Sequence, residues 1–332
     1  MTSKGSKPMS NILVCGGAGY IGAHMAKYLA AAGHKPTVYD NLCTGHREAV
    51  RWGELIEGDM LDAESLRRAL QARRFDAVMH FCAFSLVGDS VKDPHAYYRN
   101  NVGGSLNLLG AMREAGVDKL VFSSTAAVYG MPEKSSIDES QPVRPINPYG
   151  WSKMMVERML MDAASAYGLR SVSLRYFNAA GADPSGEIGE SHHPETHLIP
   201  NVLKAALDGG TVNIFGDDYG TPDGTCVRDY VHVNDLAAGH MLALEHMDRR
   251  PGAHRYNLGS DTGFSVQQVV EAARRITGRP ITTKVGPRRA GDPPTLVASS
   301  AAARQELGWK PVYGDVVSII ETAWRWHRTP KY

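Results

Sequence analysis

The segment NPYGWSK, residues 147–153, places a tyrosine four residues before a lysine and directly after a proline. Proline suits the first turn of a helix, so we expect a helix that begins near Tyr149 and carries Tyr149 and Lys153 on one face. A tyrosine with a pKa of about 10 is a poor base near neutral pH, but a nearby ammonium group favours the phenolate and lowers that pKa. The spacing therefore predicts a general acid and base, although an ordinary tyrosine beside a solvated lysine gives the same pattern.

Hydroxyl groups end the β-rich run that precedes this segment, KLVFSST at residues 119–125. In parallel sheets, ligands bind at the carboxyl ends of the strands. We therefore expect Ser123, Ser124 or Thr125 to help hold a reacting oxygen near the tyrosine.

A glycine-rich loop, VCGGAGYIG, follows the first β-rich run and places glycines at Gly16, Gly19 and Gly22. Glycine permits a tight turn and lets backbone N–H groups and a helix N-terminus approach a pyrophosphate. Asp40 ends the second strand, 18 residues past Gly22, where a carboxylate binds the adenosine ribose and repels a 2′-phosphate. The pattern predicts a site for NAD rather than NADP; the simpler interpretation is a glycine turn and a capping acid. A bound, positively charged nicotinamide would also lower the pKa of the tyrosine.

Short β-rich runs alternate with helical stretches along the first half of the chain, which is typical of βαβ units and a parallel sheet. The expected strands are 11–17, 35–40, 55–59, 77–82, 119–125 and 171–177, and the expected helices include 20–33, 62–72 and 100–116. The predicted fold is α/β: a Rossmann-type doubly wound parallel sheet with a smaller C-terminal α/β substrate domain. We expect a flexible tail over 1–10, an NAD-binding domain over 11–178 and a substrate domain over 179–332. The later runs TVNIFG and HRYNLGS are assigned to the smaller domain, and residues 228–246 are apolar enough to pack back on the first.

Composition narrows the classes of function. The chain has 332 residues, 43% of them hydrophobic, and a formal net charge of +1, which gives no electrostatic case for nucleic acid or an anionic membrane. No apolar run approaches the ~18 residues that span a bilayer. The polar start, MTSKGSKPMS, lacks the apolar core of a signal peptide, so we expect a cytoplasmic protein.

Three histidines, His192, His193 and His197, form an HHxxxH pattern in a Gly/Pro-rich segment after residue 178. Such a pattern in a loop can bind zinc. A loop that covers the ligand explains the same residues, so we expect no metal site.

The motifs taken together resemble the extended short-chain dehydrogenase/reductase superfamily and, within it, the UDP-glucose (UDP-galactose) 4-epimerases. The resemblance covers nearly the whole chain. It is carried by ILVCGGAGYIG, VYDNL, EGDM, MHFCAFSLVGDSV, YYRNNVGGSLNLL, FSSTAAVYG, PINPYGWSKMMVE, LRYFNAAGADPSGEIGE, HLIP, IFGDDYGTPDGTCVRDYVHVNDLAAGH, YNLG and PRRAGDPP.

The resemblance implies a role for each matching position. Those implied to contact a tightly bound NAD are Gly16, Gly19, Tyr20, Ile21, Gly22, Asp40, Asn41, Asp59, Phe81, Ala83, Asn100, Lys153 and Phe177. Those implied to contact the UDP-sugar are Thr125, Tyr149, Asn178, His197, Leu198, Asn213, Phe215, Arg228, Arg289, Asp292 and Leu296. Tyr149, Lys153 and Thr125 would form the catalytic set, and two arginines suit a diphosphate.

Three positions depart from the pattern of the resembled family. Ser85 stands where many members have a lysine that contacts the cofactor, and Thr125 replaces the commoner serine. Leu296 stands near a position that limits pocket size and is often Tyr or Cys, so the pocket is expected to admit an N-acetyl group at sugar C2.

The resemblance implies an isomerase that interconverts UDP-glucose and UDP-galactose through a 4-keto intermediate, and commonly a homodimer built on a helix bundle. The N-acetylhexosamine or pentose pair remains an alternative substrate. A 4,6-dehydratase is disfavoured because Ala126 and Ala127 stand where that class carries an acidic pair. A non-catalytic NAD sensor is disfavoured because Tyr149, Lys153 and Thr125 are all present.

Overall fold

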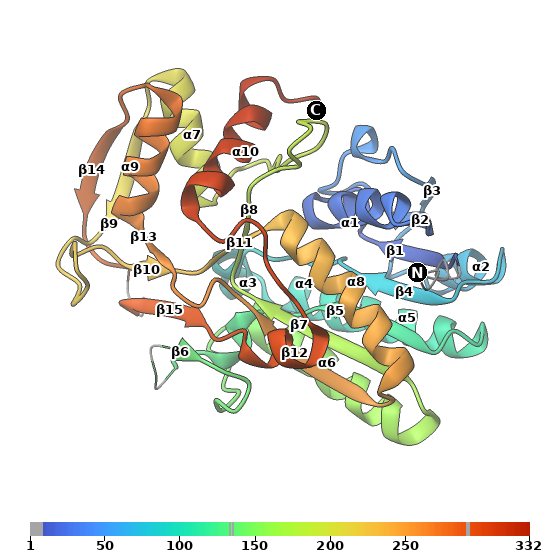
Figure 1. Ribbon diagram of the computed structural model, residues 1–332. Helices are drawn as coiled ribbons and strands as arrows, with labels where there is room; N and C mark the ends of the chain where they lie inside the picture. The colour runs from blue at the N-terminus through green and yellow to red at the C-terminus, as the bar shows by residue number, and fades with distance from the viewer. Residues whose placement is uncertain (1–8, 133, 135, 290–292) are drawn as a thin grey trace, which may run out of the picture.

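A seven-stranded parallel sheet forms the main layer of the computed structural model, which describes residues 9–132, 134, 136–289 and 293–332 (Figure 1). The strand order is β12-β7-β5-β4-β1-β2-β3, so the order reverses between β1 and β4, as in doubly wound folds. The strands are β1 (Asn11–Cys15), β2 (Lys35–Asp40), β3 (Glu54–Glu57), β4 (Ala77–His80), β5 (Lys119–Ser123), β7 (Arg170–Tyr176) and β12 (Ala253–Leu258). The predicted Rossmann-type sheet is confirmed.

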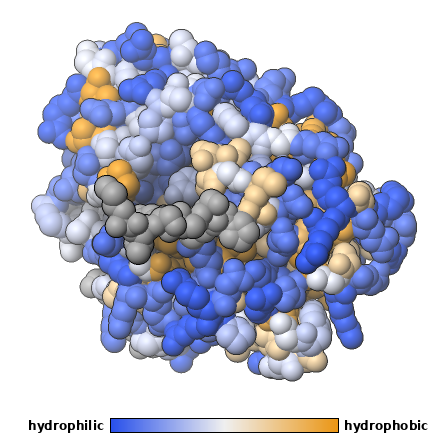
Figure 2. All heavy atoms as spheres, turned by 45° about the vertical axis from the view of Figure 1, so that its right-hand side comes forward, coloured by the Kyte–Doolittle hydropathy of each residue, from blue (hydrophilic) through white to orange (hydrophobic). Residues whose placement is uncertain are grey.

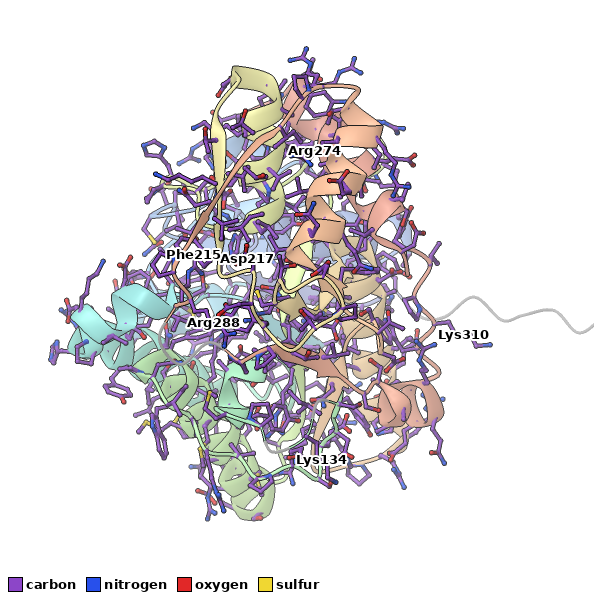
Figure 3. All side chains as sticks on the ribbon, turned by 90° about the vertical axis from the view of Figure 1, so that its left-hand side faces the viewer. Lys134, Phe215, Asp217, Arg274, Arg288 and Lys310 are labelled. Carbon is purple, nitrogen blue, oxygen red and sulfur yellow. The ribbon has the colours of Figure 1, made fainter. Side chains whose placement is uncertain are left out.

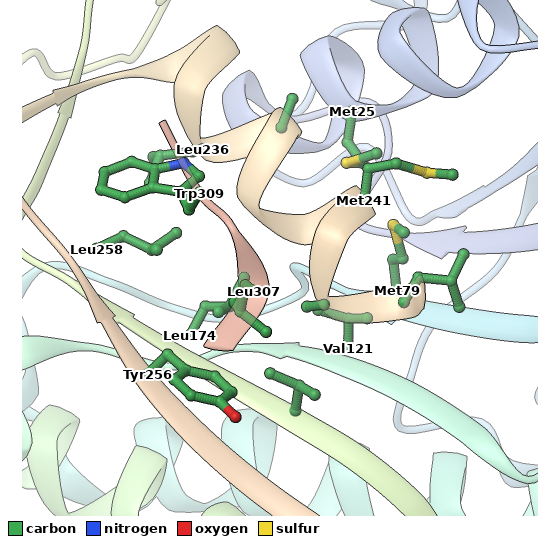
Figure 4. Close-up of a cluster of buried hydrophobic side chains, with 14 of the residues drawn as sticks. Met25, Met79, Val121, Leu174, Leu236, Met241, Tyr256, Leu258, Leu307 and Trp309 are labelled. Atoms are coloured by element: carbon green, nitrogen blue, oxygen red, sulfur yellow. The ribbon is translucent and has the colours of Figure 1, made fainter. Parts of the chain in front are cut away.

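Helices cover both faces of this sheet because its strands are apolar on both sides. One face carries α1 (Tyr20–Ala31) and α8 (Val233–Arg249), and the other carries α2 (Ala63–Gln71), α5 (Gly104–Glu114) and α6 (Pro148–Tyr167). Figure 4 shows the first of these cores, where Met25 of α1 and Met241 of α8 pack above Val121 and Leu174 of the sheet. The connections of this region also contain short helical segments: η1 (Arg47–Ala49), α3 (Val87–Lys92), α4 (Pro94–Tyr97), η2 (Tyr98–Gly103) and η3 (Ala126–Tyr129).

A smaller α/β region lies beyond the carboxyl ends of these strands (Figure 1). It has a sheet of order β13-β10-β15-β6 and two parallel pairs, β8 with β11 and β9 with β14. Its strands are β6 (Ser136–Ile137), β8 (Asn178–Ala180), β9 (Thr211–Phe215), β10 (Val227–Arg228), β11 (Tyr230–His232), β13 (Phe264–Ser265), β14 (Thr282–Gly286) and β15 (Thr295–Ala298). Its helices are α7 (Leu198–Asp208), α9 (Val266–Thr277) and α10 (Val316–Arg328), which share one core, and η4 (Ala303–Leu307) lies beside the main sheet.

The assignment of HRYNLGS to the smaller region is wrong. Strand β12 pairs in parallel with β7, from Ala253 opposite Ser171 to Leu258 opposite Tyr176, and so forms the edge of the main sheet. Helix α8 provides the crossover to β12 by packing beside α1, as expected for residues 228–246. Of the expected tail over 1–10, residues 1–8 lie outside the described part of the chain.

The surface is predominantly hydrophilic on the face shown in Figure 2, where hydrophobic side chains gather only in small groups. Among the helices that the structure describes, none is both long and apolar enough to cross a bilayer.

Candidate active site

A cavity of about 1410 Å³ lies where the main sheet meets the smaller region. Its walls come from residues that follow β1, β4 and β5 and from residues of β9, β10 and β15. Ligand pockets usually enclose about 300–1,000 Å³, so this cavity has room for more than one bound molecule. Its position at the reversal of strand order is where doubly wound sheets bind their ligands.

The glycine loop joins β1 to the N-terminus of α1 on the cavity wall. Gly16 has a φ of +80°, and a Cβ there would lie 2.7 Å from the Cys82 backbone nitrogen. A Cβ on Gly22 would lie 2.1 Å from the Gly16 carbonyl oxygen. The turn therefore closes only if positions 16 and 22 have no side chain. The first N–H groups of α1, which have no partner within the helix, then lie at the cavity wall, where they could bind a pyrophosphate. The loop fits a dinucleotide.

We expect Gly22→Ala to abolish retention of NAD, because the new methyl group forces the loop open and displaces the amide donors. The measurement is nucleotide released from the denatured, purified variant. Gly110→Ala is the matched control: Gly110 lies in α5, and a Cβ there would meet no atom within 4 Å, so NAD content should match the wild type. Equal NAD content in both variants would contradict the assignment of the loop.

Three of the residues predicted to hold the adenosine lie at the ends of β2 and β3, outside the lining of the large cavity. The Asp40 carboxylate accepts hydrogen bonds from the backbone N–H groups of Ala18, at 2.9 Å, and Leu42, at 2.8 Å. Burial raises the pKa of Asp40, although these two hydrogen bonds oppose the rise. The Asn41 amide donates to Asp59 at 3.0 Å, so these polar groups form one cluster beside the glycine loop.

The other residues predicted to contact NAD line the cavity, with the exception of Asn100. Those on the wall are Gly16, Gly19, Tyr20, Ile21, Gly22, Phe81, Ala83, Lys153 and Phe177. Asn100 is not on it: its side-chain amide donates to the Asn101 side-chain oxygen at 3.0 Å. Asn101 in turn donates to the Ser152 hydroxyl on α6, so this pair of asparagines fixes α6 against η2.

Helix α6 positions the tyrosine and the lysine as the sequence predicts. The Asn147 side chain caps the helix by accepting from the Gly150 N–H at 2.8 Å, and Pro148 occupies its first position. Tyr149 faces the cavity, where its phenol hydrogen-bonds the Thr125 hydroxyl. The Lys153 ammonium lies 5.9 Å from the centre of the Tyr149 ring and donates to the Ser123 carbonyl at 2.7 Å. The structure thus brings Thr125, Tyr149 and Lys153 together.

The pKa of Tyr149 is shifted opposite to the direction expected from the sequence. Burial raises it, and the hydrogen bond from Thr125 only partly offsets the rise. Burial also lowers the pKa of Lys153 to about 7, against the opposing charges of Cys82 and Glu157. Lys153 is therefore only partly charged near neutral pH, so it favours the phenolate less than a full ammonium would.

A buried ion pair lies directly beneath this set, one turn farther along α6. Arg175 of β7 is 1% exposed and contacts both carboxylate oxygens of Glu157, with its Nε 2.9 Å from Oε1. Glu157 also accepts from the Ser124 hydroxyl, and Arg175 donates to the Tyr129 hydroxyl at 2.9 Å. The ion pair therefore connects α6, the end of β5 and β7 close to the catalytic residues.

The residues predicted to bind the nucleotide end of the substrate line the opposite wall. On this wall are Asn178, His197, Leu198, Asn213, Phe215, Arg228, Arg289 and Leu296, whereas Thr125 and Tyr149 line the cavity beside Lys153. Asp292 lies outside the described residues. The Arg289 guanidinium lies 4.0 Å from the centre of the Phe215 ring. Its neighbour Arg288 instead pairs with Asp218 and does not line the cavity. Figure 3 shows Phe215 at the end of β9 and Arg288 just after β14, the two paired strands of the smaller region.

Several wall residues escaped prediction. Tyr176 lines the cavity and hydrogen-bonds Ser123; its place directly before Phe177 and Asn178 in RYFN was the available signal. Glu190 also lies on the wall, beside His192 and His197, and its carboxylate points toward both imidazoles. No pattern in the sequence pairs Glu190 with these histidines.

The fold and cavity define a dinucleotide-binding α/β enzyme with a tyrosine–lysine pair. The chain belongs to the NAD dependent epimerase/dehydratase family, which it matches over residues 12–259. UDP-glucose 4-epimerase of Lacticaseibacillus casei is 52% identical over 318 residues, covering 95% of this chain and 96% of that protein. The resemblance to the 4-epimerases is confirmed.

Solved structures agree with this relationship. UDP-glucose 4-epimerase from Brucella ovis, in complex with NAD, superposes with a TM-score of 0.93 at 51% identity and covers 95% of this chain and 97% of that one. UDP-glucose 4-epimerase from Bifidobacterium longum, in complex with NAD+ and UDP, has a TM-score of 0.91 at 37% identity, with coverage of 97% and 99%.

Proposed function

We propose that the chain is an NAD-dependent isomerase that interconverts UDP-galactose and UDP-glucose at sugar C4. The observation that carries this proposal is that the glycine loop, Tyr149, Arg228 and Arg289 all line one cavity. Residues 11–178, completed by α8 and β12, would hold NAD and present Thr125 and Tyr149 to the sugar, and the rest of residues 179–332 would hold the nucleotide of the UDP-sugar.

Each side chain then has a defined task. The glycine loop holds the pyrophosphate of NAD, Asp40 and Asn41 hold the ribose, and Asp59 lies at the adenine. Arg228 and Arg289 bind the diphosphate of the substrate, because two guanidinium groups match its charge and geometry. The Phe215 ring stacks against the Arg289 guanidinium, whose central carbon lies 4.0 Å from the ring centre.

Tyr149 performs the proton transfer. It accepts the proton of the sugar 4-hydroxyl and later returns a proton to the same oxygen, while Thr125 orients the phenol through their hydrogen bond. Bound NAD supplies reversible hydride transfer at C4. The 4-keto sugar would rotate in the site so that its other face meets the cofactor, while its nucleotide stays anchored. Binding energy remote from the reacting carbon therefore holds the intermediate. Burial raises the pKa of the Tyr149 phenol, and the positive charge of a bound nicotinamide would lower it.

Incubation of the purified protein with UDP-galactose, without added NAD, tests the proposal. Conversion to UDP-glucose, resolved by chromatography, is the expected result and also demonstrates a retained cofactor. Failure to convert UDP-galactose even with added NAD would refute it. UDP-GalNAc and UDP-arabinose, incubated separately, define the sugar range.

Leu296 governs that range in our proposal. It lies on the cavity wall in β15, opposite Arg228 of β10. Leucine leaves more room than tyrosine, so we expect epimerisation of UDP-GlcNAc by the wild type and at least about a tenfold lower rate in Leu296→Tyr, with UDP-galactose turnover less affected. No detectable turnover of UDP-GlcNAc by the wild type would contradict this expectation.

We also infer a homodimer formed through α5 and α6. Leu106 of α5 and Trp151, Met155 and Met161 of α6 are large hydrophobic side chains exposed in the single chain. Covering such residues is favourable in water, and helix faces of this kind pack as four-helix interfaces. Sedimentation equilibrium tests the inference, which a monomer at micromolar concentration would exclude.

A further inference from the structure

Four side chains converge in the segment that connects β8 to α7. Glu190, His192, Glu195 and His197 each offer one nitrogen or oxygen atom, and all four atoms lie within 4.8 Å of one another. The Nδ1 atoms of His197 and His192 are 2.7 Å and 3.2 Å from Glu190 Oε1. They are 3.3 Å and 3.7 Å from the nearest Glu195 oxygens.

Three of these four atoms, from Glu190, His192 and His197, are buried and lack a well-aligned hydrogen bond among the described residues. Glu190 is 3% exposed, and its Oε1 has no hydrogen-bond partner of acceptable geometry among the residues that the structure describes. The same holds for the Nδ1 atoms of His192 and His197. The short separations are ion-pair contacts whose geometry is poor for hydrogen bonds, so these three atoms keep donor or acceptor capacity that a bound cation could use. A buried carboxylate oxygen left in this condition is costly without a cation.

We propose that Glu190, His192, Glu195 and His197 bind a divalent transition-metal ion of the zinc class. Zinc bonds of about 2.0–2.2 Å in a tetrahedron separate the ligand atoms by about 3.4 Å. The Nδ1-to-oxygen separations, 2.7 to 3.7 Å, bracket that value. Two imidazoles with two carboxylates suit zinc, whereas calcium and magnesium prefer oxygen ligands alone.

The neighbours hold the four ligands in place. The Trp326 indole N–H donates to the Glu190 carbonyl at 2.8 Å, and His46 hydrogen-bonds the Ser191 carbonyl at 3.0 Å. Glu195 accepts the backbone N–H of His197 at 2.8 Å through Oε1, which leaves Oε2 for a metal. This site differs from the HHxxxH pattern of the sequence, because His193 is exposed and takes no part.

The proposed ion has a structural consequence for the cavity. His192 and His197 line its wall, so a metal that binds both imidazoles and both carboxylates fixes that wall across the β8–α7 connection. The epimerisation proposed above needs no metal for its chemistry, so the two proposals stand or fall separately.

Protons are the competing occupants of the cluster. Burial by itself lowers the pKa of His197, but Glu190 and Glu195 outweigh it and raise the pKa to about 10. The same opposition raises the pKa of His192 to about 9. A divalent metal that binds these two nitrogens replaces their protons.

The test is a titration of chelator-treated, full-length protein with Co²⁺, followed by visible absorption, and with Zn²⁺, followed by calorimetry. A Cys43→Ser background removes the exposed thiol, which would otherwise compete. We expect one equivalent to bind, with the intense absorption of four-coordinate cobalt. The matched control His193→Ala should behave identically, whereas His192→Ala and Glu195→Gln should lose the absorption and at least about tenfold in affinity.

Circular dichroism and thermal melting separate loss of a ligand from loss of the fold. A folded His192→Ala variant that binds one equivalent as tightly as the wild type would overturn the proposal, because the metal would then lie elsewhere. Absence of stoichiometric metal binding to the folded wild type at pH 8 would also overturn the proposal. The cluster would then consist of protonated imidazoles paired with the two carboxylates. A raised melting temperature with Zn²⁺, seen in the wild type and His193→Ala only, supports it.

Discussion

Tyr149→Phe is expected to lower kcat for UDP-galactose by about 10³-fold, within the range by which general acid–base catalysis accelerates reactions. Phenylalanine keeps the ring against the cavity wall but removes the oxygen that Thr125 orients and that exchanges the proton. KM should change little, because the substrate is anchored by its nucleotide at the opposite wall. Coupled measurement of UDP-glucose formation gives both constants.

Tyr167→Phe is the matched control for this effect. Tyr167 is the last residue of the same helix, and its ring is partly exposed under Arg113. The control should retain wild-type kcat, and both variants should retain NAD. Near-wild-type epimerisation by Tyr149→Phe would show that another group transfers the proton.

Arg175→Met is expected to reduce the free energy of unfolding by about 3–5 kcal/mol, because it leaves the Glu157 carboxylate buried without its partner. Glu157 is 7% exposed, so water cannot replace the guanidinium. The Tyr129 hydroxyl also loses the hydrogen bond that it accepts from Arg175. Urea denaturation, monitored by circular dichroism, measures the change.

Arg158→Met provides the control at an adjacent position of α6. Arg158 pairs with Asp162 at the surface, where an ion pair contributes little, so its loss should cost no more than about 0.5 kcal/mol. The double variant Glu157→Met with Arg175→Met should recover most of the stability, since no unpaired charge remains. Equal destabilisation by Arg175→Met and Arg158→Met would contradict the importance assigned to the buried pair.

Local patterns were sufficient for the parts of the site that neighbours in sequence define. The spacing of Gly16 and Gly22 predicts the closed turn because a Cβ on Gly22 would meet the nearby Gly16 carbonyl, whereas the close approach of Cys82 to Gly16 is a tertiary contact. Tyr149 and Lys153 share a face because they are four residues apart on a helix that Asn147 caps. Resemblance of whole motifs also predicted which residues of the smaller region reach the cavity, including Arg228 and Arg289.

The amino-acid sequence by itself therefore determined the doubly wound sheet, the glycine loop and the tyrosine–lysine pair, since each follows from short-range spacing and strand–helix alternation. Only the tertiary structure decided that β12 joins the main sheet, that the Asn100 amide bonds Asn101 instead of lining the cavity, and that Glu190 meets His192 and His197. The tertiary structure also decided the direction of both pKa shifts, because burial raises the pKa of Tyr149 and lowers that of Lys153. Desolvation depends on atoms brought together from β4, β5, β7 and α6, and no local spacing records how completely they exclude water.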